Sequence, residues 1–237
     1  MLSGCGVYDG TEVHEAAATL AALTRHGFEP VPCAPNKALA HVINHSVGEE
    51  SKEERNVMNE SARIARGAVA NLNDIKANDV KAIVFPGGFG AAKNLSDFGF
   101  KGADMTVDPD VVRILKEFHS AKKPIALCCI SPILAAKVFG KDGVKVRNYC
   151  SSSTDTFMFR FKVTLGKQGD ESVWPFGGAL DAARSFGAEV VEAEVSEVCV
   201  DEKNLIVTTP AYMYAGKFHQ IQDGVSKWID QLVKMIK

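Results

Sequence analysis

Cys129 is the residue of this chain whose type and position best suit chemistry. It follows an apolar segment, residues 124–127, that predicts a buried parallel strand, and it precedes a predicted helix over residues 131–138 with Pro132 in its first turn. A cysteine on such a strand-to-helix turn has the position of the serine in a nucleophile elbow. Because a helix N-terminus favours the reactive thiolate over the thiol, we expect Cys129 to be an activated nucleophile.

A glycine-rich turn offers a partner for such a nucleophile. Residues 86–90 read Pro-Gly-Gly-Phe-Gly and follow a second apolar strand pattern at residues 79–85. Glycine lets backbone approach a ligand closely, so the amides of Gly88 and Ile130 are candidates for holding the negative charge that forms after thiolate attack on a carbonyl. Glycine pairs at strand ends are also ordinary turns, and the spacing alone leaves both interpretations open.

Bulk composition narrows the class of protein. With 237 residues and no linker-like segment, the chain favours one α/β domain over two small ones. A net charge of -2 with interspersed signs gives no patch for nucleic acid, and no apolar run approaches the roughly 20 residues that span a bilayer. Six cysteines without C-x-x-C spacing indicate free thiols. We therefore expect small molecules or other subunits as partners, and neither nucleic acid nor a membrane.

Helical and strand patterns alternate along the chain. Helices are predicted over residues 12–26, 53–65, 108–120, 131–138 and 217–236, and strands over 28–33, 79–85, 124–127, 197–200 and 205–209. This alternation predicts a parallel or mixed sheet with helices on both faces. Ligand sites in such sheets lie outside the carboxyl ends of the strands, so residues 4–15, 86–94 and 129–132 should converge.

Several strings of this sequence, at residues 2–16, 41–45, 55–57, 85–95, 129–132 and 207–213, together resemble the ElbB/ES-one family of the DJ-one/PfpI superfamily. The resemblance covers nearly the whole chain. It implies a flavodoxin-like three-layer α/β sandwich with a mainly parallel central sheet, of the class I glutamine amidotransferase-like type. It also implies an elbow cysteine, no cofactor and a homodimer. Bacterial relatives are described as glyoxalase-like and animal relatives as mitochondrial, so a mitochondrial location is implied, with the cytoplasm as the alternative.

The resemblance assigns roles by position. Cys129 matches the elbow cysteine, Glu15 matches the acidic residue beside its thiol, and Gly88 and Ile130 match the oxyanion amides. An acid held near a thiol shares a proton with it or stays neutral, and it can move that proton during aldehyde chemistry. Without the resemblance, Glu15 would be interpreted as a solvated carboxylate in the first turn of a helix.

Other residues are weaker candidates. Side chains alternate along a strand, so Cys128 should point away from Cys129 and pack as a small apolar residue. His45, His14, Cys5 and Asn94 are possible substrate contacts, although a turn cysteine or a surface histidine at these positions is equally often without a role.

Metal chemistry is not expected. The cluster of His41, His45, Glu49 and Glu50 lacks the spacing that would bring a third ligand to a histidine pair. Residues 164–170 also lack the histidine that some superfamily members have there, so a Cys-His dyad of that type is not carried over.

The chain departs from the family pattern in two places. The first central strand should precede residues 3–6, but only Met1 and Leu2 stand there, so we expect a gap in the core, an incomplete gene product and a native N-terminal extension that carries the strand. Residues 147–163 interrupt what the family has as one strand. We expect a poorly packed insertion there within a single domain over residues 1–237.

Three functional classes remain. The leading class is a cofactor-independent enzyme that uses Cys129 and Glu15 on methylglyoxal-type aldehydes or their adducts, as a glyoxalase or deglycase does. A glutaminase is less favoured, because residues 207–213 lack the His-x-Glu pair of that class. The alternative is a non-catalytic redox-sensing or protective protein whose Cys129 is oxidised.

Overall fold

The centre of the protein is a four-stranded sheet in which three strands run parallel. The computed structural model describes residues 1–140 and 161–236. In it, β5 (Ile83–Phe85), β6 (Ile125–Cys128) and β10 (Ile206–Thr209) are parallel neighbours, and β9 (Cys199–Asp201) pairs antiparallel with β10. The predicted α/β class with a mainly parallel central sheet is confirmed.

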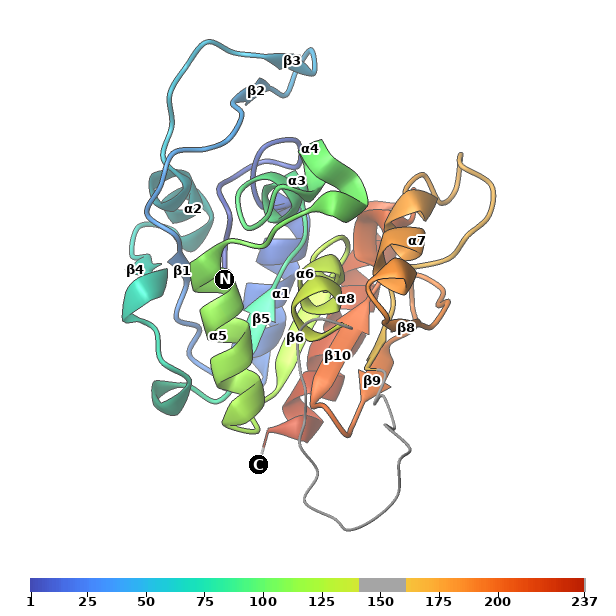
Figure 1. Ribbon diagram of the computed structural model, residues 1–237. Coiled ribbons are helices and arrows are strands. Elements are labelled where there is room, and N and C mark those ends of the chain that lie inside the picture. The colour runs from blue at the N-terminus through green and yellow to red at the C-terminus, as the bar shows by residue number, and fades with distance from the viewer. Residues whose placement is uncertain (141–160, 237) are drawn as a thin grey trace.

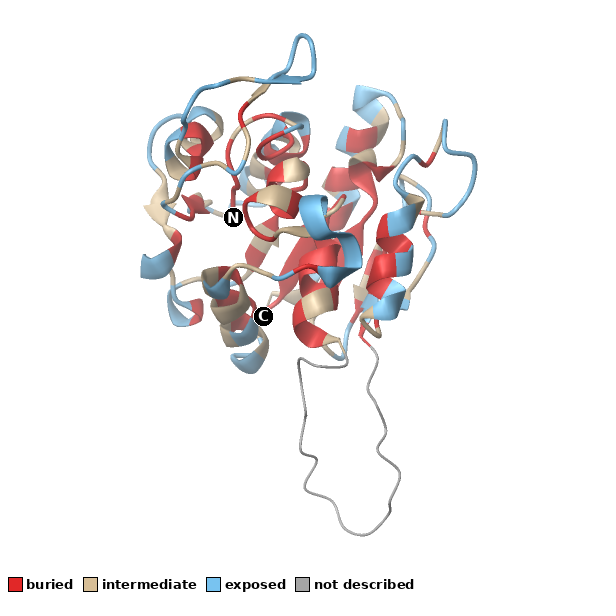
Figure 2. Ribbon diagram, turned by 45° about the horizontal axis from the view of Figure 1, so that its top comes forward, coloured by how far each residue is buried: buried red, intermediate tan, exposed pale blue. Residues whose placement is uncertain are grey.

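Helices cover both faces of this sheet, as Figure 1 shows. On one face α1 (Val13–Arg25) packs beside the C-terminal helix α8 (Phe218–Met235). On the other lie α5 (Pro109–Ser120) and α6 (Pro132–Phe139), with α7 (Gly177–Ser185) beside α6. The result is a three-layer sandwich, in which Figure 2 shows the strands as the most continuously buried part.

The remaining elements are short. Two flanking pairs are parallel, β1 (Cys33–Ala34) with β4 (Ala70–Asn71) and β7 (Lys162–Val163) with β8 (Glu189–Val190), and β2 (Ile43–Asn44) forms a hairpin with β3 (Glu49–Glu50). The other helices are α2 (Val57–Ala65), α3 (Phe89–Lys93) and α4 (Phe98–Lys101), with 3₁₀ turns η1 (Leu72–Asp74), η2 (Ala77–Asp79), η3 (Gly102–Asp104) and η4 (Ala211–Met213). No helix among the residues described is long and apolar enough to cross a membrane.

Local sequence explains where the main elements begin. All four residues of β6 are fully buried, which is why its sequence is a continuous apolar run instead of an alternating one. The α5 helix begins at Pro109 because the Asp108 side chain accepts a hydrogen bond from the Asp110 amide. The predicted helix over 53–65 begins only at Val57, since Asn56 caps it in the same way.

The predicted strand over residues 28–33 is largely wrong. Only Cys33 of that range is in a strand, which continues to Ala34. Two prolines, Pro30 and Pro32, lack the amide hydrogen that a ladder needs, so the segment is extended without regular pairing.

The N-terminal residues lie between β1 and β5. The Met1 ammonium donates to the Val84 carbonyl at 2.8 Å, and the Leu2 amide donates to the Cys33 carbonyl at 2.7 Å. A cavity of about 430 Å³ adjoins them, with Met1 and Leu2 among its lining residues. These two backbone bonds place residues 1 and 2 against β1 and β5, and the expected gap in the core stays a prediction.

The structure corrects the end of the expected insertion. Of residues 147–163, those from 147 to 160 lie outside the described part of the chain. Phe161 is buried, and Lys162 and Val163 form β7, with the Lys162 amide donating to Asp201 Oδ2 at 2.8 Å. These last three residues therefore belong to the packed domain, because β7 supplies apolar contacts that the sheet edge needs.

Candidate active site

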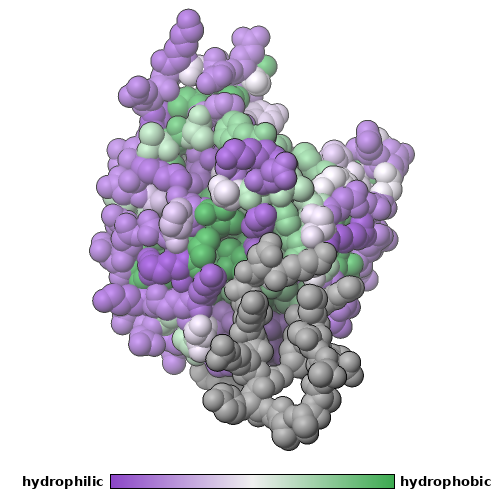
Figure 3. Space-filling model, in the orientation of Figure 1, coloured by the Kyte–Doolittle hydropathy of each residue, from purple (hydrophilic) through white to green (hydrophobic). Residues whose placement is uncertain are grey.

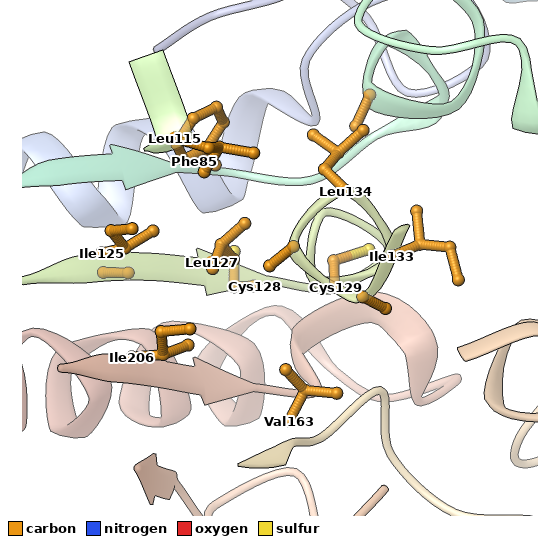
Figure 4. Close-up of a cluster of buried hydrophobic side chains, with 14 of the residues drawn as sticks. Phe85, Leu115, Ile125, Leu127, Cys128, Cys129, Ile133, Leu134, Val163 and Ile206 are labelled. Atoms are coloured by element: carbon orange, nitrogen blue, oxygen red, sulfur yellow. The ribbon is translucent and has the colours of Figure 1, made fainter. Parts of the chain in front are cut away.

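Cys129 lies on a tight turn between β6 and α6. Figure 4 shows it after the end of the β6 arrow, where the α6 coil begins. Its φ is 59°, a left-handed conformation that is uncommon for a residue other than glycine. The turn is held by hydrogen bonds from the Cys129 amide to the Thr209 carbonyl, at 3.0 Å, and from Ser131 Oγ to the Pro86 carbonyl, at 2.7 Å. This geometry is that of a nucleophile elbow.

Glu15 projects from the first turn of α1 into the same place and is fully buried. Its Oε2 accepts a hydrogen bond from the Gly87 amide at 2.7 Å, its Oε1 accepts one from the Tyr212 amide at 3.1 Å, and its carboxyl group hydrogen-bonds the Cys129 thiol. The interpretation of Glu15 as a solvated carboxylate is therefore wrong.

Gly87 is the point where the acid and the thiol meet. A Cβ atom built on Gly87 would lie 2.3 Å from Cys129 Cβ, and 2.7 Å from both Cys129 Sγ and Glu15 Oε2. Any side chain there would force the pair apart, so this position requires glycine.

The shared environment raises the pKa of both the Glu15 carboxyl group and the Cys129 thiol. Burial, and then the nearby Glu12 carboxylate, raise the pKa of Glu15 to about 7. Burial, and then the Glu15 carboxylate, raise the pKa of the Cys129 thiol well above its usual range, against the opposing effect of the Gly88 and Ile130 amides. The Ile130 amide at the start of α6 lowers the thiol pKa as expected, but burial outweighs it. Two acidic groups this close interact strongly, so each influences the titration of the other.

Two backbone amides face the sulfur. The amides of Gly88 and Ile130 both hydrogen-bond the Cys129 side chain. Gly88 has a φ of 93°, and a Cβ atom on it would lie 2.3 Å from the Glu12 amide nitrogen and 2.4 Å from the Gly10 carbonyl oxygen. The absence of a side chain therefore lets this turn approach both Cys129 and the loop before α1.

Cys128 differs from its sequence interpretation. It is fully buried, as a packing residue would be, but its thiol lies 3.6 Å from Glu15 Oε2 and donates to it. The left-handed turn at Cys129 breaks the strand alternation, so both neighbouring cysteines contact the same carboxyl group.

Two residues without a predicted role complete the polar end of the site. The Glu12 carboxylate accepts from the Glu15 amide at 2.7 Å and hydrogen-bonds His14 Nδ1 at 2.9 Å. The Tyr212 hydroxyl is buried without a hydrogen-bond partner among the residues described, and burial raises the pKa of Tyr212 to about 12. In the sequence, Glu12 is marked only as the start of a predicted helix. Tyr212 is marked only by lying in the segment 207–213 that resembles the family.

The structure separates the weaker candidates from this site. His14 reaches it through Glu12 and through an edge contact with the Tyr212 ring, whose centroid lies 6.2 Å from its own, and its side chain is 57% exposed. His45 Nε2 accepts from the Tyr8 amide at 3.2 Å, and Cys5 lies in the turn before α1. None of these three lines the cavity beside Cys129.

Asn94 also stands apart from the cavity. Its Nδ2 donates to the carbonyls of Ser3 and Asp9, each at 2.8 Å, and its Oδ1 accepts from the Ala40 amide at 2.9 Å. The whole amide group is used in holding backbone, which leaves nothing for a substrate. Among the described residues, no group of three or more His, Cys, Asp or Glu side chains could hold a metal ion.

A cavity of about 660 Å³ opens beside Cys129. Its walls come from α3, α4 and η3 on one side and from α7 with the preceding turn on the other, and Glu12, Cys129, Ile130 and Tyr212 lie at its margin with the elbow. The Cys129 sulfur, an acid, two amide donors and a space for a ligand are therefore contiguous.

Comparisons with known proteins place the chain in a family, although no family model matches it. It is 47% identical to "ES1 protein homolog, mitochondrial" of Rattus norvegicus over 99% of this chain and 82% of the relative. It is 46% identical to "Glutamine amidotransferase-like class 1 domain-containing protein 3, mitochondrial" of Homo sapiens, over 99% of this chain and 81% of the relative.

Solved structures agree on the architecture. An isoprenoid biosynthesis protein with amidotransferase-like domain from Ehrlichia chaffeensis has a TM-score of 0.82 and 30% identity, covering 98% of this chain and 96% of the other. Drosophila melanogaster DJ-1beta shares the fold at a TM-score of 0.50 and 14% identity, covering 96% of this chain and 92% of the other. The chain belongs to the ES1 family of proteins with the amidotransferase-like, DJ-1/PfpI fold.

Proposed function

We propose that this protein is a cysteine-dependent enzyme that acts on reactive aldehydes of the methylglyoxal type, or on their adducts, without a cofactor. The observation that carries the proposal is the contact of the Cys129 thiol with a fully buried Glu15 and with two backbone amides. Since relatives are named as mitochondrial proteins, we propose the mitochondrion as its location.

The first step is addition to the carbonyl. The Cys129 thiol gives its proton to Glu15, and the resulting thiolate attacks the aldehyde carbon. A carbon–sulfur bond forms while the carbonyl π electrons move to oxygen, where the Gly88 and Ile130 amides stabilise the charge. The oxygen then takes the proton from Glu15, which gives a hemithioacetal and a carboxylate.

The second step is an internal proton shift. The Glu15 carboxylate removes the proton from the former aldehyde carbon, and the ketone oxygen takes up a proton as an enediol forms. Glu15 then returns its proton to the neighbouring carbon while the hydroxyl of the former aldehyde carbon gives up its own, which converts the hemithioacetal of a 1,2-dicarbonyl into a thioester. Water then hydrolyses the thioester to a hydroxy acid and frees the thiol. The sum is aldehyde plus water to hydroxy acid, so no outside oxidant or reductant is required.

A Glu15 pKa of about 7 suits this role, because the group can both accept and donate a proton near neutral pH.

The test is product formation by the purified chain from methylglyoxal, with no added thiol or cofactor and lactate as the measured product. We expect many turnovers per protein molecule. Stoichiometric adduct formation on Cys129 without lactate would reject the enzyme and favour a protective protein.

A further inference from the structure

The cavity beside Cys129 is far larger than methylglyoxal. Its volume of about 660 Å³ falls in the range of pockets that hold drug-sized molecules, roughly 300–1,000 Å³. A three-carbon aldehyde attached to Cys129 would fill only a small part of it. The remaining space has its own chemical character, which points to what the substrate carries.

The walls of the cavity are apolar and aromatic. Phe89 and Phe98 come from one side and Phe176, Ala179 and Met213 from the other. The rings of Phe89 and Phe176 meet edge to face, with centroids 6.0 Å apart and planes at 76°. On the face shown in Figure 3, hydrophobic residues gather around the middle of the molecule while hydrophilic residues cover its outer parts.

The polar groups in the wall are mostly occupied. Asp181 Oδ1 accepts from Gln168 and Arg184, the Ser185 hydroxyl donates to the Ala182 carbonyl, and Glu12 is engaged as described above. The buried hydroxyl of Tyr212 lacks a hydrogen-bond partner among the residues described. The walls therefore offer few hydrogen bonds to a sugar or a peptide backbone.

The charged groups around the cavity disfavour anionic ligands. No lysine, arginine or histidine of the described chain lines this cavity, whereas two carboxylates, Glu12 and Asp181, do. A phosphate or carboxylate on the substrate would lie beside these two carboxylates, while Lys93, which stands 5.4 Å from the centre of the Phe89 ring, donates to the Tyr8 carbonyl.

We propose that this cavity holds a neutral aromatic or aliphatic group of the substrate, so that the preferred electrophile of Cys129 is a carbonyl compound bearing a substituent larger than methyl. The proposal rests on the proposed function for the reaction at Cys129. The apolar group would be buried against Phe89, Phe176 and Ala179 while the carbonyl carbon faces the sulfur. The proposal therefore assigns the cavity to a small-molecule substrate and not to a second copy of the chain.

The experiment measures labelling of the full chain by N-methyl-, N-ethyl-, N-butyl- and N-phenylmaleimide, with each rate divided by that of free cysteine. Mass spectrometry assigns the labelled residue. Each buried methylene should speed Cys129 labelling up to about fourfold, and butyl should exceed methyl by at least about tenfold. Cys5, which lines no part of the cavity, is the control in the same molecule and should vary less than about threefold.

Substitutions in the cavity wall test whether the gain in labelling rate with chain length arises there. Ala179→Trp should fill the cavity and abolish the gain with chain length, and Ala179→Leu should fill it less and reduce the gain. Gly177→Ala in the same helix is the matched control, since a Cβ atom there meets nothing within 4 Å. Equal normalised labelling rates of Cys129 by all four maleimides in the unmodified chain would overturn the proposal. A loss of self-association in Ala179→Trp would then assign the cavity to a second copy.

Turnover separates this proposal from the proposed function. We expect kcat/KM for phenylglyoxal to exceed that for methylglyoxal by at least about tenfold, with Cys129→Ala as the blank. A chain-length effect in labelling without turnover of either aldehyde would keep the apolar site and reject the enzyme. Equal turnover of both aldehydes with flat labelling would keep the enzyme and reject the apolar site.

Discussion

The turn at Cys129 and the turn at Cys5 contain the same ingredients but differ in what surrounds them. Both have a cysteine near glycines and an acidic residue, and in both cases burial and a carboxylate raise the pKa of the thiol. Cys129 also contacts two backbone amides, hydrogen-bonds a fully buried acid, and borders a cavity of about 660 Å³.

Cys5 has none of these additions in the described structure. Its turn is closed by backbone bonds, from the Gly6 amide to the Thr11 carbonyl at 2.9 Å and from the Thr11 amide to the Gly4 carbonyl at 3.2 Å. The acid that raises its pKa, Glu60, is paired with Arg63 at 2.8 Å. The comparison teaches that a cysteine near an acid is not sufficient, because a site also requires donors for developing charge and space for a ligand.

The two turns should differ most in how much aldehyde turnover is lost when the cysteine of each is removed. Cys129→Ala should abolish aldehyde turnover, because no other thiol in the described part of the chain contacts both amides, and Cys5→Ala should change it by less than about twofold. Lactate formation by the two purified variants measures this. Comparable losses in both would mean that the two turns act together.

Removal of the acid at each turn should give the next largest effect. Glu15→Gln should lower kcat by roughly 10²- to 10⁴-fold, as loss of a general acid–base group does. Glu60→Gln should leave kcat per folded molecule unchanged. Because Gln offers one oxygen to the two amides of Gly87 and Tyr212, circular dichroism must first show that Glu15→Gln is folded. Full activity in folded Glu15→Gln would remove this residue from the mechanism.

A smaller effect should distinguish a positioning role for Asn94 from substrate binding. Asn94→Ala leaves buried partners unsatisfied near the Cys5 turn and should lower the free energy of unfolding by about 2–4 kcal/mol. Its KM should stay the same, and exposed Asn59→Ala should change stability by less than about 0.5 kcal/mol. Urea unfolding and steady-state kinetics give both quantities. A large KM change with normal stability would restore Asn94 as a substrate contact.

The amino-acid sequence predicts those helices and strands whose formation depends on short-range patterns. The helix at 108–120 carries its cap and proline, and the strand before Cys129 is a continuous apolar run, so both follow from short-range rules. The strand expected over 28–33 failed because its prolines interrupt pairing. The pairing of Glu15 with Cys129 came from family resemblance and not from spacing.

Other features depend on long-range geometry that no pattern contains. The contact of Cys128 with Glu15 follows from the left-handed turn at Cys129, and the Tyr212 amide reaches Glu15 from a residue 197 positions away. The burial that raises the pKa of the Cys129 thiol is likewise not readable from its neighbours in the chain.

The central claim is that Cys129 and Glu15 share a proton, and the pH dependence of Cys129 alkylation by iodoacetamide tests it most directly. The account predicts that the rate rises through about pH 7, where the Glu15 pKa lies and the pair passes from two protons to one. In Glu15→Gln this step should be absent, and the rate should rise only above the usual range of a thiol. A single rise at the same pH in both proteins would contradict the account.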